Sequence, residues 1–204
     1  AVTALAKYRD SLDDSIRDKL AVGDVKSASV LLQAADAAGL DALSQGLLRG
    51  ELHIIKGEFQ KAVDILEPLK QEFPSSIAVR GILAMAHHRL GFELELIEGM
   101  RELKDQRPTE FTDYLYRGWM YSNYAPQEGL PDIREARQLK PASLIVLVRE
   151  AEALYHQAAW PPDPKGSLDY ALAAIERLKA LQLLVPGNEL IEKELALSFI
   201  SASV

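Results

Sequence analysis

The chain has no cysteine, few histidines and no long apolar run. Without cysteine it can form neither a disulfide nor a thiolate zinc site. None of the four histidines stands in an H-E-x-x-H pair, so we expect no metal site. No apolar run reaches the roughly 18 residues that a membrane-spanning helix needs. We therefore expect no membrane insertion.

Positive charge is also in short supply, because 23 Lys+Arg face 30 Asp+Glu and the net charge is −7. That balance argues against a partner made of nucleic acid. Hydrophobic residues make up 48% and charged residues 26% of the chain. This is the composition of a globular protein, and it excludes a disordered tail or a fibre.

Catalytic signatures are missing as well. The chain has no G-x-S-x-G elbow, no G-x-x-x-x-G-K-[ST] loop and no G-x-G-x-x-G fingerprint, so we expect no enzyme, no catalytic residue and no cofactor. It starts at Ala1 without methionine or a signal-peptide pattern, which predicts an excised piece of a longer protein. The compartment stays open, although we favour the cytoplasm because this stretch has no signal peptide or spanning segment.

What the sequence does contain is a repeat of 34 residues. The series that share this step are Gly23, Gly57 and Gly91, then Gly50, Ala84 and Gly118, then Pro74 and Pro108. Several series in one phase indicate a true repeat. Each period holds two apolar stripes at helical spacing, separated by a glycine and closed by a proline, which predicts pairs of helices. The small residues of the second series are expected where the two helices of a pair cross closely.

The fourth period is less regular. Its turn is expected over 124–131, which contains two prolines, and its second helix is expected to be short or kinked at Pro131. In its first helix the spacing places Tyr114 and Tyr121 in the core and leaves Tyr116 more exposed.

These features resemble the tetratricopeptide repeat (TPR) family. The second period supplies the small, turn, apolar and closing residues at the family's positions: Gly50, Gly57, Phe59, Ala62, Leu66 and Pro74. The resemblance implies an all-α, right-handed superhelical solenoid of about five TPR-like hairpins and a C-terminal capping helix. We expect one domain over 1–204, with units of about 1–42, 43–76, 77–110, 111–144 and 145–187 and a capping helix over 188–204.

The resemblance also implies where a ligand binds, because TPR proteins line a concave groove with the first helix of each pair. The groove residues that we single out are Met85, His88, Arg89, Leu115, Trp119, Asn123, Arg149 and His156. An aromatic residue flanked by arginines is typical of binding hot spots, so we expect a peptide with an apolar anchor on Trp119 and acidic groups near Arg89 and Arg149. In the equally weighted alternative, Trp119 belongs to the core and the arginines pair with carboxylates of the protein.

We therefore interpret the chain as a non-catalytic protein–protein interaction module. The stretch 113–119 and the long-looped fifth unit look similar to TPR regions of bacterial serine/threonine kinase-type proteins, and that context would make the module a docking or regulatory region.

One alternative is a structural self-association or spacer module that forms a homodimer through its terminal helices, because apolar residues such as Phe199 and Ile200 crowd the last helix. Another is a sensor that holds an anion with His88, His156 and Arg89. The insertion 160–166 is either a second contact surface or a proline-stiffened turn in which Trp160 covers a helix end.

Overall fold

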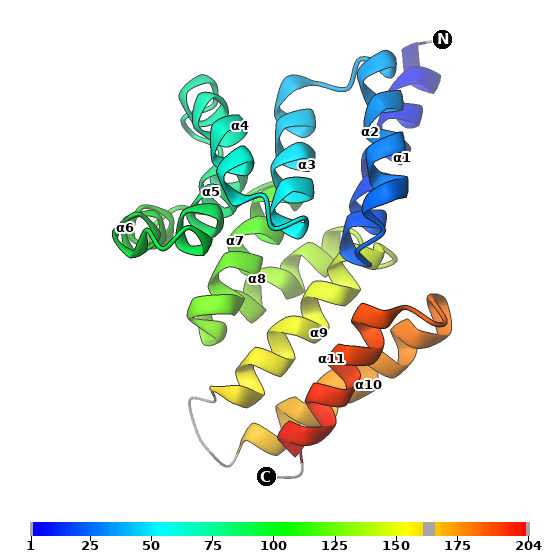
Figure 1. The fold of residues 1–204 in the computed structure, drawn as a ribbon, viewed down its shortest axis with the longest axis vertical. Helices are drawn as coiled ribbons and strands as arrows, with labels where there is room; N and C mark the ends of the chain where they lie inside the picture. Colours follow the sequence, from blue (N-terminus) through cyan, green and yellow to red (C-terminus); the bar gives the residue numbers. More distant parts are fainter. Residues whose placement is uncertain (1, 161–165, 203–204) are drawn as a thin grey trace. The chain divides into compact units, whose positions relative to one another are not determined.

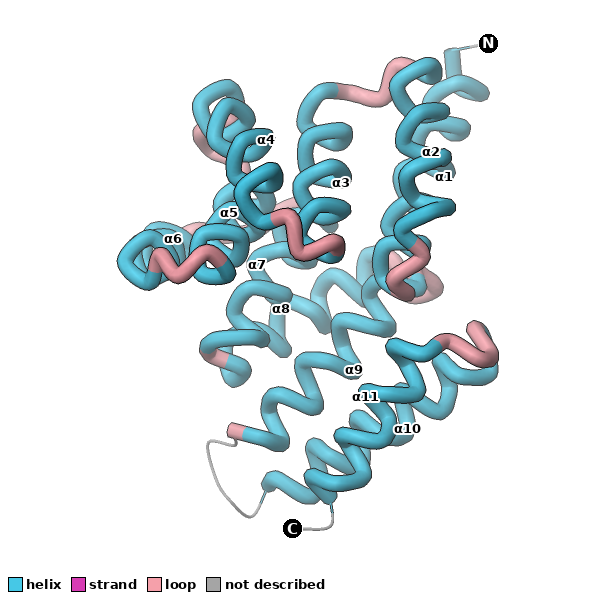
Figure 2. Tube along the Cα trace, viewed as in Figure 1, coloured by secondary structure: helices cyan, strands magenta, loops and turns pink. Residues whose placement is uncertain are grey.

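The computed structural model describes residues 2–160 and 166–202, and in these ranges it contains eleven α-helices and no strand (Figure 2). The helices are α1 Val2–Ala21, α2 Val25–Ala38, α3 Ala42–Ile55, α4 Phe59–Glu72, α5 Ile77–Arg89, α6 Glu93–Lys104, α7 Phe111–Tyr124, α8 Pro126–Leu139, α9 Leu144–Ala159, α10 Ser167–Leu184 and α11 Glu189–Ala202. The prediction of an all-α protein built from consecutive helix pairs is confirmed.

The chain divides into two compact units, Ala1–Pro108 and Thr109–Val204. The first unit holds α1 to α6 and the second holds α7 to α11. We describe each unit by itself, and a single domain over 1–204 stays a prediction.

In the first unit each helix packs on the next one in the chain, and the first helices of successive pairs also touch (Figure 1). Thus α3 contacts α1 and α5 in addition to its own partner α4. The apolar stripes explain this packing, because the residues that they align are buried between the helices. The cluster formed by α1, α2 and α3 contains Ile16, Leu20, Ala28, Leu32 and Leu48.

The turns inside the pairs of the first unit require glycine. Gly23, Gly57 and Gly91 have φ of 72°, 73° and 86°, a left-handed conformation that other residues rarely adopt. The glycine series with a step of 34 residues is therefore a series of left-handed turns.

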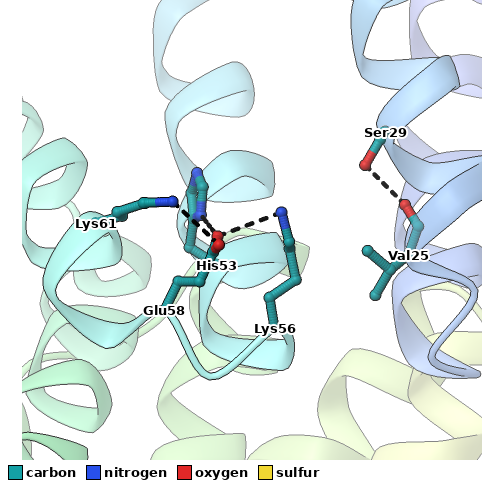
Figure 3. A network of polar contacts seen from close by, with 6 residues as sticks. All are labelled: Val25, Ser29, His53, Lys56, Glu58 and Lys61. Atoms are coloured by element: carbon teal, nitrogen blue, oxygen red, sulfur yellow. Dashed lines mark hydrogen bonds and ion pairs between the residues drawn. The ribbon is translucent and has the colours of Figure 1, made fainter.

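The second of these turns carries a polar cluster around Glu58 (Figure 3). Its carboxylate accepts a hydrogen bond from Lys61 Nζ at 3.0 Å, lies 2.7 Å from His53 Nδ1 and pairs with Lys56 at 3.3 Å. The hydrogen bonds from Lys61, His53 and Lys56 lower the pKa of Glu58 to about 2.

The small residues lie at helix crossings, as predicted. A Cβ atom on Gly50 would lie 2.9 Å from Leu66, and one on Gly118 would lie 2.8 Å from Ile133. In the third pair the roles are exchanged, because Ala84 of α5 meets Gly99 of α6. Close helix packing thus accounts for the second series of the repeat.

The prediction of the turn in the fourth pair was wrong, and of the two alternatives for its second helix, short or kinked at Pro131, the first is excluded. The turn predicted over 124–131 is only Ala125, since α7 ends at Tyr124 and α8 begins at Pro126. Proline suits the first position of a helix, where its missing N–H has no partner to lose. Pro131 lies inside α8, which still has 14 residues and so is not short.

A close approach between α7 and α8 accompanies this short connection. A Cβ on Gly129 would lie 2.3 Å from the backbone nitrogen of Ser122, so only glycine fits there. Tyr116, predicted to be exposed, is completely buried, whereas Tyr121 is buried as predicted. The helices cross so closely that both faces of α7 carrying these tyrosines are covered.

The second unit is also tied together by buried ion pairs. Arg117 of α7 donates from Nε to Asp132 of α8 at 2.6 Å. Glu150 of α9 accepts hydrogen bonds from Arg137 of α8 at 2.6 Å and from Arg177 of α10 at 3.1 Å. Burial by itself would lower the pKa of Arg117, but the hydrogen bond and charge of Asp132 raise it above its ordinary value. These pairs join α7 to α8 and α9 to both of its neighbours in the chain.

Candidate functional site

The predicted groove residues all lie on first helices of pairs. Met85, His88 and Arg89 belong to α5 in the first unit. The others belong to the second unit, where α7 carries Leu115, Trp119 and Asn123 and α9 carries Arg149 and His156. Helices α7 and α9 pack against each other, so the structure brings these five residues onto neighbouring elements.

On α5 the three residues differ in accessibility. Met85 is buried, at 5% exposed. His88 Nδ1 lies 3.0 Å from the carboxylate of Glu93, at the start of α6. Arg89 is exposed, and its guanidinium lies 5.1 Å from the ring centroid of Phe59 on α4. Among the described residues no carboxylate pairs with Arg89, so its charge is open to a ligand.

On α7 and α9 an arginine is held on an aromatic ring. The guanidinium of Arg149 lies 3.7 Å from the centre of the Trp119 ring, a cation–π contact. Its Nη1 also donates to both carboxylate oxygens of Glu152, at 2.9 and 3.0 Å. Trp119 is only 8% exposed, and Arg149 is buried as well. These are the contacts expected if Trp119 belongs to the core and Arg149 pairs within the protein.

Two further predicted residues support this arrangement. Asn123 Nδ2 donates to the backbone oxygen of Trp119 at 2.8 Å. Leu115, one turn before Trp119, is fully buried. Asn123 is thus partly exposed and held on the backbone of α7, whereas Leu115 belongs to the core.

His156 lies at the other end of α9. Its ring stacks on that of Trp160, with centroids 6.3 Å apart and an angle of 11° between the planes. Burial lowers the pKa of His156, and the nearby charge of Glu152 acts in the opposite direction. His156 Nδ1 is buried and has no hydrogen-bond partner among residues 2–160 and 166–202.

Trp160 is 65% exposed and is the first residue of the predicted insertion. The remaining residues of that insertion, 161–165, lie outside the described residues. At its far end Ser167 Oγ donates to the backbone oxygen of Ala158 at 2.7 Å, which fixes the start of α10 to the end of α9.

Sequence reasoning missed two acidic residues of this region. Glu152 stands three residues after Arg149 on the same face of α9, a spacing at which an arginine and a carboxylate can pair. Glu194 of α11 has a raised pKa, first because it is partly buried and second because Glu152 is close. No sequence pattern predicts that proximity, since it depends on how α11 packs against α9.

The described part of the chain holds no group of three His, Cys, Asp or Glu side chains arranged for a metal ion. Nor is any helix there both apolar enough and long enough to span a bilayer. Comparison with protein families, curated protein sequences and solved structures gave no match to this chain. The all-helical, repeat-like architecture thus stands on the 34-residue period and the packing of the helices.

Proposed function

We propose that the chain is a TPR-like superhelical solenoid, one domain over 1–204, that binds a protein or peptide in its concave groove without catalysis. The observation that carries this proposal is the packing of first helices on one another, α1 on α3 and α3 on α5 in one unit and α7 on α9 in the other. In helical solenoids this layer forms an extended inner surface suited to elongated ligands.

The side chains of the layer suggest the ligand. Arg89 of the first unit offers an exposed positive charge, whereas Arg149 of the second unit is buried against Trp119 and paired with Glu152. A ligand with an acidic group fits Arg89, because hydrogen bonds between charged groups are strong. From the sequence resemblance we further propose that the module belongs to a longer, kinase-type bacterial polypeptide.

The test is a capture experiment with two matched variants. The Arg89→Glu change reverses an exposed charge on a first helix, and Arg134→Glu makes the same reversal on α8, a second helix with an exposed Arg134. Peptides selected from a random library on the wild-type chain are titrated against all three proteins. We expect acidic peptides whose affinity falls roughly tenfold in Arg89→Glu, the loss of one charged hydrogen bond, and stays unchanged in Arg134→Glu. Equal affinity for both variants would refute groove binding.

A second candidate is self-association through the ends of the helical array. Six large apolar side chains of α10 and α11 are exposed, among them Phe199 at 47%, Ile200 at 61%, Leu184 at 63% and Leu183 at 86%. Exposed apolar groups on a terminal helix favour contact with another copy. This candidate predicts dimers at micromolar concentration in sedimentation experiments, lost in Phe199→Ser/Ile200→Ser and unaffected by Arg89→Glu.

A further inference from the structure

Helix α11 holds the place of a first helix, but no second helix covers it in the described part of the chain. Each earlier first helix packs against the helix that follows it, as α9 does against α10. By contrast, α11 packs on the helices that precede it, α10 and α9 (Figure 1). Its inner face includes Ile191 and Ser198, which are buried. The side of α11 that points away from these two residues is therefore uncovered.

The repeat identifies this uncovered side. In α5, α7 and α9 a small buried residue stands eight positions after the N-cap residue, namely Ala84 after Ser76, Gly118 after Glu110 and Ala151 after Ser143. Helix α11 is capped by Asn188, whose side chain accepts a hydrogen bond from the backbone nitrogen of Ile191 at 3.0 Å. Eight positions after this cap stands Ala196, which is exposed. Ala196 thus marks the face that a second helix covers in the earlier pairs.

Two large apolar side chains accompany Ala196 on this face. Phe199 and Ile200 follow it by three and four residues, a spacing that keeps them on one side of the helix, and they are 47% and 61% exposed. Tyr121 of α7 and Leu154 of α9 hold the place of Phe199, and each is only 4% exposed. The surface that belongs to the core in α7 and α9 is therefore open in α11.

The second pair of the first unit shows which side chains cover such a face. A Cβ on Gly50 of α3 would lie 2.9 Å from Leu66 of α4. Four residues earlier, a Cβ on Gly46 would lie 2.5 Å from Leu69, which stands three residues after Leu66. Because the contact moves back along α3 as it moves forward along α4, the two helices are antiparallel. Leucine side chains of the second helix thus fill the space above the small residues.

The same pairing carries charge in α5 and α6. Ala84 meets Gly99, and Arg80, four residues before Ala84, pairs at 3.0 Å with Glu102, three residues after Gly99. In α11 the residue four positions before Ala196 is Glu192, which is exposed. A helix that covers α11 in this register would therefore place a lysine or an arginine beside Glu192.

Two lysines border this face, but no described residue pairs with Glu192. Lys193 is the next residue of α11, and successive residues of a helix point about 100° apart. Lys179 of α10 lies 5.4 Å from the ring centroid of Phe199, at the other end of the face. The place beside Glu192 is thus left to a cation from outside the chain.

Two α11 helices would cover each other poorly. In an antiparallel pair centred on Ala196, a residue four positions before Ala196 lies beside one four positions after it, so each Glu192 would face an Ile200. A carboxylate against an apolar side chain loses water without gaining a partner. The occupant that fits carries a cation where α11 itself has Ile200.

We propose that the outer face of α11 docks an antiparallel amphipathic helix of a partner protein. This helix has leucine or isoleucine over Ala196 and, three residues later, lysine or arginine beside Glu192. It takes on α11 the place that α4 has on α3 and α6 has on α5. The face is the one turned toward a second helix, so the proposal does not depend on binding in the groove.

The test uses the full chain and two alanine-based helical peptides of about 20 residues, long enough to form a helix in water. One repeats Leu-x-x-Lys along one face, and the other repeats Leu-x-x-Glu. We expect the wild type to prefer the lysine peptide. Ala196→Leu fills the space at the crossing and should weaken its binding at least about tenfold, since overpacking costs that much. Ala180→Leu, the same change at an exposed alanine of α10, is the matched control and should bind as the wild type does.

A charge reversal tests the register. Glu192→Lys should weaken binding of the lysine peptide roughly fivefold, the contribution of one exposed ion pair, and should make the chain prefer the glutamate peptide. Both alanine variants should keep the denaturation midpoint of the wild type, because alanine and leucine have similar helix propensity.

The proposal is overturned if the wild type does not bind the lysine peptide, if it binds both peptides equally, or if Ala196→Leu keeps its affinity. A loss as large in Ala180→Leu would also overturn it. A lower denaturation midpoint for Ala196→Leu would show that the chain itself covers this face, and a change from dimer to monomer would make a second copy the occupant. Either result contradicts a partner helix.

Discussion

The two units differ in the exposure of the ion pairs that join neighbouring helices. In the first unit the pair Arg49–Asp36 is exposed at 40% and 43% of its side chains, and the Glu58 cluster lies on a turn. In the second unit the side chain of Asp132 is only 8% exposed and that of Glu150 only 6%. Ion pairs at the surface contribute little to stability, whereas a buried charge depends strongly on its partner.

The first unit also buries charge, since Arg17 is 1% exposed and pairs with Asp13 on the same helix, and Glu51 is completely buried. The contrast therefore concerns the ion pairs that join one helix to the next, which are buried in the second unit.

Breaking one buried pair should have the largest effect. Arg117→Met leaves the buried carboxylate of Asp132 without its cation, and we expect a loss of about 3 kcal/mol in the free energy of unfolding. Arg49→Met, which breaks the exposed pair with Asp36, should cost less than about 1 kcal/mol. Both values follow from urea denaturation monitored by circular dichroism.

The double variant Arg117→Met/Asp132→Leu serves as the control for this prediction. Because it removes both charges, it should recover most of the stability that the single change loses. If Arg117→Met and Arg49→Met were equally stable, the contrast between the two units would be wrong.

The helix crossings sharpen the same contrast. Gly129→Ala would drive a Cβ against the backbone of Ser122, and overpacking of this kind costs about 1–3 kcal/mol. Gly50→Ala meets only the side chain of Leu66, which can rotate away, so its loss should be smaller. Thermal denaturation of the two variants compares a helix crossing where the added Cβ meets backbone with one where it meets a side chain. A lower melting temperature for Gly50→Ala than for Gly129→Ala would contradict the account.

Glu194 in the second unit should oppose folding as it ionises. Its pKa in the folded protein is raised, so the protonated form is favoured, and its favourable contribution is present below the pKa of the unfolded chain and lost as the pH rises through the folded value. Glu194→Gln should therefore be more stable than the wild type at neutral pH and equally stable in acid, below the ordinary range of glutamate. Denaturation curves across this range provide the measurement. A variant that is less stable than the wild type at neutral pH would show that the negative charge of Glu194 stabilises the fold, which would contradict the prediction.

Glu58 in the first unit should behave in the opposite way, with the smallest effect because it is exposed. Its folded pKa of about 2 lies below its ordinary value of 4.5, so its contribution is present above about 4.5 and lost as the pH falls through 2. Glu58→Gln should be slightly less stable than the wild type at neutral pH, and the difference should shrink as the pH falls through 2. Salt should reduce the difference, since exposed charges are screened. A difference as large at pH 2 as at neutral pH would mean that the charge of Glu58 is not its cause.

The parts of the fold that follow a local rule were predictable. Gly57 recurs because a left-handed turn needs it. The predicted capping helix over 188–204 begins where the side chain of Asn188 accepts a hydrogen bond from the backbone nitrogen of Ile191 at 3.0 Å. The length of α8 and the burial of Tyr116 were not predictable in this way. The burial of Tyr116 depends on how α7 packs against α8 and α9, and the connection of one residue before α8 departs from the spacing of the repeat.

The candidate site shows the same limit. The sequence placed Trp119 and Arg149 on first helices, and the structure stacks one on the other. A repeat pattern does not determine side-chain directions. It therefore predicts neither the burial of Trp119 and Arg149 nor the ion pair between Arg149 and Glu152. Pairs such as Glu150 with Arg177, far apart in the chain, carry no local signal at all.

The central claim, recognition of a partner by the first helices, is tested most directly by amide chemical-shift mapping. The isotope-labelled full chain is titrated with a peptide selected on it, and the shifted amides are assigned to helices. The account predicts that the shifts concentrate on first helices, with Arg89 of α5 and Asn123 of α7 among the affected residues. Shifts confined to second helices such as α4 and α8, or to α11, would contradict it.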